Sequence, residues 1–253
     1  MLPSISPIQH NEIFTIRTYE IDSQKRITAP ALIKLMHEAA MQNVIKIRLS
    51  VWDLEPHHIS WVLMRKVLRI DRLPMLGEKI TVVTNPSGFE KFFTYRDYRV
   101  YDESETLIAQ SSSTWLLMDT QKRRMARIPD FILKMNDQMP KPEDCLPRPQ
   151  GKIPKLEQSD RQKNYEVNWF DLDFNQHLNN TYFIQWMLEA LDKQLLSQGM
   201  LKELEIVYKQ EAQWQEQVLS EVQALGNGRY LHRLTRASDG KEMASAFSGW
   251  GVG

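Results

Sequence analysis

One short run, residues 173–177 (DFNQH), brings a carboxylate, an amide and an imidazole together. An imidazole titrates near neutral pH, so His177 can move a proton or orient a reacting group. Asp173 and Asn175 can hold a water molecule or the imidazole through hydrogen bonds. Asn179 and Asn180, which follow after Leu178, are good N-cap residues, which predicts that the run leads into the start of a helix. The run is therefore a candidate catalytic turn.

The predicted helix start adds a second chemical element to this turn. Unpaired backbone N–H groups and the positive end of the helix dipole lie there, and they can stabilise an oxyanion. Loss of one such donor typically costs about 2.7–4 kcal/mol of barrier height. The same residues also fit a plain polar turn with a helix cap. A metal site is not expected, because one His and one Asp without a second His nearby fall short of zinc-ligand spacing.

The chain contains an internal repeat. FTIRTYEID (residues 14–22) aligns without a gap with YEVNWFDLD (165–173), and ITAPALIKLMHEAA (27–40) aligns at the same offset with LNNTYFIQWMLEAL (178–191). The identical pairs in the helical part are Ile33 with Ile184, Met36 with Met187, Glu38 with Glu189, and Ala39 with Ala190. A register kept across a strand, a turn and a helix indicates duplication.

The two copies of the turn differ in the residues that could do chemistry. The first copy, residues 22–26, reads DSQKR, whereas the second, residues 173–177, reads DFNQH. The aspartate is shared, but the asparagine and the histidine occur in the second copy alone. We expect such an asymmetry when a duplicated chain keeps its scaffold twice and its active site once.

Each half reads as a short strand, a turn, an apolar helix and then a run of strands. The expected helix faces are Leu32, Leu35, Met36, Ala39, Asn43, Val44 and Ile47 in the first half, and Phe183, Trp186, Met187, Ala190, Leu191 and Leu195 in the second. The expected strands are 61–70, 78–84, 91–101 and 105–119, then 201–212, 217–225, 229–238 and 241–250. One helix with several antiparallel strands buries itself best when the sheet wraps around the helix, so we predict an α+β fold.

A proline-rich stretch separates the halves. Residues 136–160 contain five prolines, which disfavour regular structure and suit a connection. The predicted organisation is an N-terminal domain over residues 1–135, a linker over 136–160 and a C-terminal domain over 161–253. The single cysteine, Cys145, falls in the linker, a poor place for a nucleophile.

Composition limits the class of protein. The 253 residues are 42% hydrophobic and 25% charged, with a formal net charge of +0, so no general basic field favours nucleic acid. We expect no membrane span, because no window approaches the ~18–20 apolar residues required. We also expect no secretory signal or transit peptide at the N-terminus. One cysteine suits a reducing compartment, and together these features predict a cytoplasmic protein.

The segment WFDLDFNQHLNNTYFIQWMLEAL (169–191) resembles the plant-type acyl-acyl carrier protein thioesterases, whose signature is a D-x-N-x-H-x-N-N turn before a helix. IRTYEID, WVLMRKVLRIDRLPMLGEKI and STWLLMDTQKRRMARIPD resemble the same family in matching order, over roughly Phe14 to Glu211. The resemblance implies a tandem (double) hot-dog fold, in which each half is an antiparallel sheet around one long helix. It implies a bacterial member that releases free fatty acid in fatty acid biosynthesis, without a cofactor.

The family's Asp, Asn and His fall on Asp173, Asn175 and His177. A family segment of the form Y-[RK]-x-E-C corresponds to residues 208–212 (YKQEA), which places the family glutamate on Glu211 and an alanine, Ala212, where the family has cysteine. A thiol acyl-enzyme is therefore not expected. The resemblance implies that Glu211, with or without His177, activates a water molecule, while Asp173 and Asn175 position the catalytic groups. Alternation along strand 201–212 alone would make Glu211 a solvated outward carboxylate.

Other readings stay open from the sequence. One is a thioesterase of the same fold that acts on acyl-coenzyme A or aromatic coenzyme A thioesters, and another is a non-catalytic acyl-binding protein. A lyase that uses Glu189 on the second helix is a minor alternative, since Glu38 occupies the matching place in the half without the histidine. Candidate residues for an acyl slot are Met36, Met41, Phe183, Trp186 and Met187.

The partner implied by the family is acyl carrier protein with its fatty acyl thioester. Because that partner is acidic, we expect docking on basic residues: Lys122, Arg123, Arg124 and Arg127, or Arg65, Lys66, Arg69 and Arg72. A tandem fold can act as a monomeric pseudo-dimer or as a homodimer.

Overall fold

The computed structural model describes residue 2 and residues 4–252. The chain forms two compact units. One takes the chain as far as Lys66 and again from Asp71 to Pro149; the other takes Val67–Ile70 and the chain from Gln150 onward. The domain limits expected from the sequence, 1–135 and 161–253, stay a prediction. None of the helices in the described part of the chain is long and apolar enough to span a membrane.

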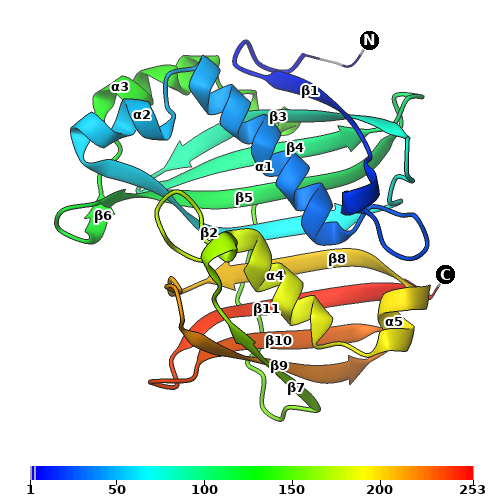
Figure 1. Cartoon of the computed structure of the whole chain (residues 1–253). Coiled ribbons are helices and arrows are strands. Elements are labelled where there is room, and N and C mark those ends of the chain that lie inside the picture. Colours follow the sequence, from blue (N-terminus) through cyan, green and yellow to red (C-terminus); the bar gives the residue numbers. More distant parts are fainter. Residues whose placement is uncertain (1, 3, 253) are drawn as a thin grey trace. The chain divides into compact units, whose positions relative to one another are not determined.

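The first unit is an antiparallel sheet with helices packed on it (Figure 1). Its strands follow the order β1-β3-β4-β5-β2, and β6 pairs with β5. The strands are β1 (His10–Thr15), β2 (Ile59–Ile70), β3 (Lys79–Glu90), β4 (Phe93–Tyr101), β5 (Leu107–Asp119) and β6 (Arg124–Ala126). The helices are α1 (Ala29–Lys46), α2 (Val51–Leu54) and α3 (Asp130–Leu133), with 3-10 turns at Thr18–Glu20, Glu55–His57, Lys134–Gln138 and Pro142–Asp144.

The second unit repeats this plan, with strand order β7-β9-β10-β11-β8. Its strands are β7 (Arg161–Glu166), β8 (Gly199–Tyr208), β9 (Gln217–Gly226), β10 (Arg229–Arg236) and β11 (Glu242–Val252). Its helices are α4 (Asn180–Glu189) and α5 (Lys193–Gln198), with a 3-10 turn at Trp169–Asp171. The strands expected from the alternating pattern are thus present in both halves.

The duplication extends to the pairing register of the strands. His10 of β1 pairs with Thr84 of β3, and Arg161 of β7, 151 positions after His10, pairs with Val222 of β9. The first strands therefore match at an offset of 151, and the third strands at an offset of 138, which is 222 minus 84. The offset of 151 matches the turn at residues 22–26 with the turn at residues 173–177. The offset of 138 matches the connection before β3 with the connection before β9.

Each long helix begins at a side-chain cap, and the cap of the second lies where the sequence predicts it. The Thr28 side chain caps α1 by accepting from the N–H of Ala31 at 3.3 Å. In the second unit, Asn179 caps α4 by accepting from the N–H of Thr181 at 3.0 Å. The buried faces are Ala29, Leu32, Ile33, Met36, Ala39, Ala40 and Asn43 on α1, and Thr181, Phe183, Ile184, Trp186, Met187 and Leu188 on α4.

The expected apolar face from Phe183 to Leu195 is wrong in one respect, because it does not belong to one helix. The helix α4 ends at Glu189, and Leu195 lies on α5. Asp192 starts this new helix by accepting from the Leu195 N–H at 2.8 Å. A good N-cap within a periodic apolar pattern thus ends one helix and begins another.

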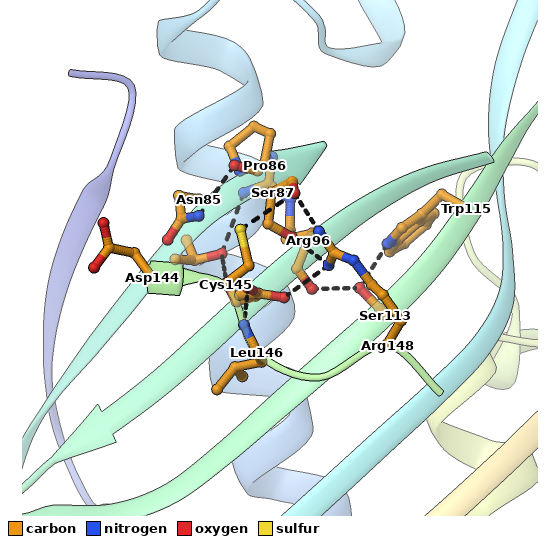
Figure 2. A network of polar contacts seen from close by, with 12 residues as sticks. Asn85, Pro86, Ser87, Arg96, Ser113, Trp115, Asp144, Cys145, Leu146 and Arg148 are labelled. Carbon is orange, nitrogen blue, oxygen red and sulfur yellow. Dashed lines mark hydrogen bonds and ion pairs between the residues drawn. The ribbon is translucent and has the colours of Figure 1, made fainter. Parts of the chain in front are cut away.

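The predicted linker packs in part on the first unit (Figure 2). Asp97 on β4 is fully buried and accepts from the Leu146 N–H at 2.8 Å, while Arg148 donates to the Ser87 hydroxyl at 2.9 Å. The Cys145 thiol donates to the carbonyl of Ser87 at 3.5 Å. Burial raises the pKa of this thiol, so Cys145 is poorly suited to act as a nucleophile.

The inner sides of the two units differ in how their polar groups are satisfied. His232 on β10 is buried, with Nδ1 3.1 Å from the Met187 carbonyl and Nε2 2.8 Å from the Ser248 hydroxyl. In the first unit Lys66 is 1% exposed, its Nζ lies 4.2 Å from the centroid of the Tyr98 ring, and no described residue accepts a hydrogen bond from it. Buried polar groups normally find partners, so Lys66 is an exception.

Candidate active site

The turn at residues 173–177 is closed by its own aspartate. Asp173 Oδ1 accepts from the N–H of Asn175 at 2.8 Å and from that of His177 at 3.2 Å. The Asp173 N–H donates to the His177 carbonyl at 2.7 Å. Gln176 has a positive φ of 61°, which lets the chain reverse within so few residues. Asp173 therefore fixes the backbone from which His177 projects.

His177 meets Glu211 across the second unit. Its Nε2 lies 3.2 Å from Glu211 Oε2, with side-chain exposures of 22% and 37%. This distance lies within hydrogen-bonding reach of an imidazole and a carboxylate, and both side chains are partly exposed to solvent. The structure thus brings together two of the four residues expected from the family signature.

Glu211 does not lie on a strand, so the expectation that it belongs to strand 201–212 is wrong. The strand β8 ends at Tyr208, and β9 begins at Gln217. Glu211 lies in the connection between them, where the alternation of inward and outward side chains does not apply. The connection is held against the catalytic turn, because the Leu178 N–H donates to the Ala212 carbonyl at 2.8 Å. Ala212 is fully buried.

The N–H groups at the start of α4 are mostly committed within the protein. Leu178 donates to Ala212 and Asn179 donates to the Asp171 carbonyl at 2.9 Å. Thr181 donates to the Asn179 side chain and Tyr182 to the Asn179 carbonyl. Over residues 178–182, the N–H of Asn180 is the one for which the described contacts give no acceptor. Of the backbone donors expected to form an oxyanion site at this helix start, the Asn180 N–H is therefore the one that remains.

The segments that carry the pair also carry exposed aromatic side chains, a feature that the sequence reading missed. Trp169 and Trp214 meet edge to face with their ring centroids 5.6 Å apart, and both are more than half exposed. Phe170 is 91% exposed, and Phe174 follows Asp173 in the turn at 64%. Large exposed apolar groups in one place mark a binding surface. The sequence did contain a signal for them: Phe174 lies within a polar turn, where packing does not require an aromatic side chain.

Asn175 is exposed, and the hydrogen bond that it contributes to the turn comes from its backbone.

Glu189, the residue of the lyase alternative, binds side chains outside the catalytic candidates. Its carboxylate accepts from Lys163 at 3.3 Å, from the Tyr165 hydroxyl at 3.2 Å and from Gln185 at 2.8 Å. We therefore assign Glu189 a structural role.

The basic residues expected to dock a partner are only partly available. Lys66 is buried, and Arg72 is bound by Glu78 at 2.5 Å and by Asp102 at 2.9 Å. Arg123 and Arg124 are exposed.

Five residues were expected to line an acyl slot. Met36, Phe183, Trp186 and Met187 are buried core residues, and Met41 is half-buried. In the described residues, no group of three or more His, Cys, Asp or Glu side chains could hold a metal ion.

Comparison with known proteins places both units in one family. Residues 7–135 match the profile of the acyl-ACP thioesterase N-terminal domain, and residues 154–251 match that of its C-terminal domain. The chain is 27% identical to an acyl-[acyl-carrier-protein] hydrolase of Cuphea viscosissima and 28% identical to a palmitoyl-acyl carrier protein thioesterase of Cuphea hookeriana. Each alignment covers 94% of this chain and 61% of the relative, so the chain spans about three fifths of the length of these proteins.

Solved structures agree with this fold. An acyl-ACP thioesterase from Bacteroides thetaiotaomicron superimposes with a TM-score of 0.87 at 17% identity, over 96% of this chain and 98% of that one. A 12:0-ACP thioesterase from Umbellularia californica gives a TM-score of 0.87 at 20% identity, over 99% and 100%. The tandem hot-dog fold expected from the sequence is confirmed.

Proposed function

The chain belongs to the acyl-ACP thioesterase family, and from that premise we propose that it hydrolyses the thioester of a fatty acyl chain carried on acyl carrier protein. The observation that carries the proposal is the approach of His177 Nε2 to Glu211 Oε2 at 3.2 Å. A carboxylate and an imidazole in contact are the groups that general base catalysis needs. The exposed aromatic residues on the same segments suit an apolar acyl substrate.

In the proposed reaction, Glu211 and His177 together take a proton from a water molecule as its oxygen attacks the thioester carbonyl carbon. The tetrahedral oxyanion then collapses, the C–S bond breaks, and the proton passes to the departing thiolate. The products are a fatty acid and the free thiol of the carrier. A thiolate is a good leaving group, so no strong acid is required. The chain's own cysteine takes no part, because Cys145 lies in the first unit, where its thiol donates a hydrogen bond to the Ser87 carbonyl.

Asp173 and Asn175 have supporting roles in this proposal. Asp173 holds the turn from which His177 projects. Asn175 has an exposed side-chain amide two residues before His177, which we assign to binding the substrate carbonyl or the attacking water. We further propose that the protein acts in the cytoplasm, as a monomeric pseudo-dimer or a homodimer, on an acyl carrier protein docked near Arg123 and Arg124.

The test is Glu211→Gln, which keeps the shape of the side chain but removes its capacity as a base. We expect kcat to fall ~10²–10⁴-fold. The matched control is Glu242→Gln in the same unit, where the carboxylate pairs with Lys209 at 2.6 Å and is similarly exposed; its kcat should stay within about twofold of wild type.

The assay is release of free thiol from acyl carrier protein and coenzyme A thioesters of graded chain length. Faster turnover of the carrier protein series supports the proposal, and preference for coenzyme A supports the alternative thioesterase. Hydrolysis of neither series would leave a non-catalytic acyl-binding protein. Wild-type kcat in Glu211→Gln would contradict the assignment of this carboxylate.

A further inference from the structure

Arg236, the last residue of β10, contacts the backbone of the proposed base. Its guanidinium donates to the Glu211 carbonyl at 2.8 Å. Its Nε lies 3.1 Å from Glu216 Oε1 as an ion pair, without the alignment of a hydrogen bond. A third contact joins it to Asp239 at 3.3 Å. The Arg236 side chain is only 16% exposed, so water screens these contacts weakly. The planar fork of an arginine can make such contacts simultaneously, which a lysine cannot.

The segment that carries Glu211 is held at both ends, and a partner of Arg236 closes one of them. Glu216 Oε2 accepts from the Gln213 N–H at 3.0 Å, which closes the connection just before β9. At the other end the Gln210 N–H donates to the Met243 carbonyl at 3.1 Å. Arg236 thus contacts the connection at the residue whose carboxylate faces His177 and at the glutamate that closes the loop.

The first unit contains the same connection with its arginine placed differently. Glu78, which matches Glu216 at the offset of 138, accepts from the Met75 N–H at 2.9 Å just as Glu216 accepts from Gln213. Its arginine, Arg72, lies on the connection itself and also pairs with Asp102. Both units therefore keep an Arg–Glu pair at this loop.

The second unit has moved the arginine to the neighbouring strand. The position that matches Arg72 is Gln210, and the guanidinium now comes from β10. From there it reaches a backbone carbonyl that Arg72 does not bind in the described contacts of the first unit. The rearrangement occurs in the unit that has a His–Glu pair.

We propose that Arg236 is a positioning residue for Glu211: by binding the Glu211 carbonyl it fixes the backbone orientation that points the carboxylate at His177. This inference rests on the proposed function. It assigns Arg236 no contact with the substrate. Without the guanidinium the segment keeps its other hydrogen bonds, but the carboxylate loses its defined distance to the imidazole.

The experiment compares Arg236→Met with Arg72→Met, which removes the corresponding arginine of the first unit. Arg72→Met leaves Glu78 and Asp102 without their cation, whereas in Arg236→Met Asp239 keeps Lys241 at 3.1 Å. The melting temperature should therefore fall at least as much in Arg72→Met as in Arg236→Met. We expect kcat of Arg236→Met to fall ~10²-fold with KM within about twofold, because misplacement of a catalytic group by about 1 Å has that effect. Arg72→Met should keep wild-type kcat.

A double-mutant cycle on kcat distinguishes a role of Arg236 through Glu211 from a purely structural role. If Arg236 acts through Glu211, the variant that combines Arg236→Met with Glu211→Gln should have the same kcat as Glu211→Gln alone. Arg236→Lys, which retains the charge but not the fork, should melt near wild type with an intermediate kcat. It also serves as the test protein if Arg236→Met does not fold.

The outcomes are distinguishable. Wild-type kcat in Arg236→Met and Arg236→Lys, with Glu211→Gln impaired, would overturn the positioning role and leave the proposed function intact. Losses that multiply in the combined variant would also overturn it, since Arg236 would then act independently of Glu211. Wild-type kcat in Glu211→Gln would overturn both assignments.

Discussion

The turns at residues 22–26 and 173–177 have the same backbone but different side-chain contacts. In each, the aspartate side chain accepts from the N–H groups two and four residues later, and the fourth residue has a positive φ, 64° at Lys25 and 61° at Gln176. The last residue makes the difference. Arg26 folds back onto Asp22 at 2.9 Å, whereas His177 faces Glu211 at 3.2 Å.

The residue opposite the turn differs as well. The Ile27 N–H donates to the Pro74 carbonyl, as the Leu178 N–H does to Ala212, so Leu73 matches Glu211. Leu73 is 8% exposed and apolar. Side-chain differences on a shared backbone, above all His177 for Arg26 and Glu211 for Leu73, therefore separate a structural turn from a proposed catalytic one. The shared aspartate teaches that Asp173 is first a turn-closing residue.

The largest expected effect comes from giving the second turn the last residue of the first. In His177→Arg the new guanidinium should fold back onto Asp173 as Arg26 does onto Asp22, and the pair with Glu211 is lost. We expect kcat to fall ~10²–10⁴-fold while the melting temperature stays near wild type. Thiol release and thermal unfolding measure the two quantities.

The reciprocal variant Arg26→His is the control for this exchange. It should leave kcat within about twofold, because Leu73 offers the new imidazole no carboxylate. Full kcat in His177→Arg would show that the contrast between the two turns has no catalytic meaning.

The interiors of the two units give the next prediction. Burial lowers the pKa of Lys66 from its ordinary 10.5 to about 7, and the nearby Arg96 guanidinium adds to this effect. Between these values the unfolded chain holds a proton that the folded chain lacks, so stability rises with pH from about 7 to 10.5. This fall in pKa is equivalent to about 5 kcal/mol at neutral pH.

Lys66→Met should therefore raise the free energy of unfolding at pH 7 by about 3 kcal/mol and flatten its pH dependence between pH 7 and 10, measured by urea titration. The opposite sign is expected in the second unit. His232→Leu should lower stability by about 1–3 kcal/mol, since it removes the imidazole contact of the Met187 carbonyl and that of the Ser248 hydroxyl, which still accepts from Trp250 Nε1 at 3.0 Å. A pH slope that survives in Lys66→Met would assign the slope to other groups.

The smallest effects are expected at the two shared aspartates. Asp22→Ala and Asp173→Ala each remove the acceptor of two backbone N–H groups and should each cost about 1–2 kcal/mol of stability. Only Asp173→Ala should also lower kcat, because it releases the backbone of His177. Asp22→Asn and Asp173→Asn keep an acceptor oxygen and should retain most of the stability. Equal kcat in the two alanine variants would mean that the turn need not be rigid.

Much of this molecule is determined by local sequence. The repeat, the two turns, the N-cap before the second long helix and the strand pattern are visible in the chain, because hydrogen bonds within a few residues and the periodicity of apolar residues create them. The family signature placed Asp173, Asn175 and His177 in one turn by the same local logic.

The tertiary structure alone determined which side chains from distant segments come into contact. Glu211 reaches His177 from an irregular connection beyond β8, where no periodicity indicates which way a carboxylate points. Lys66 belongs to a basic run in the sequence, yet it is buried because β2 turns it inward beside Leu68. Arg236 gained its contact with Glu211 because the end of β10 lies next to that connection. Side-chain pairs between distant segments follow from packing, which local sequence does not encode.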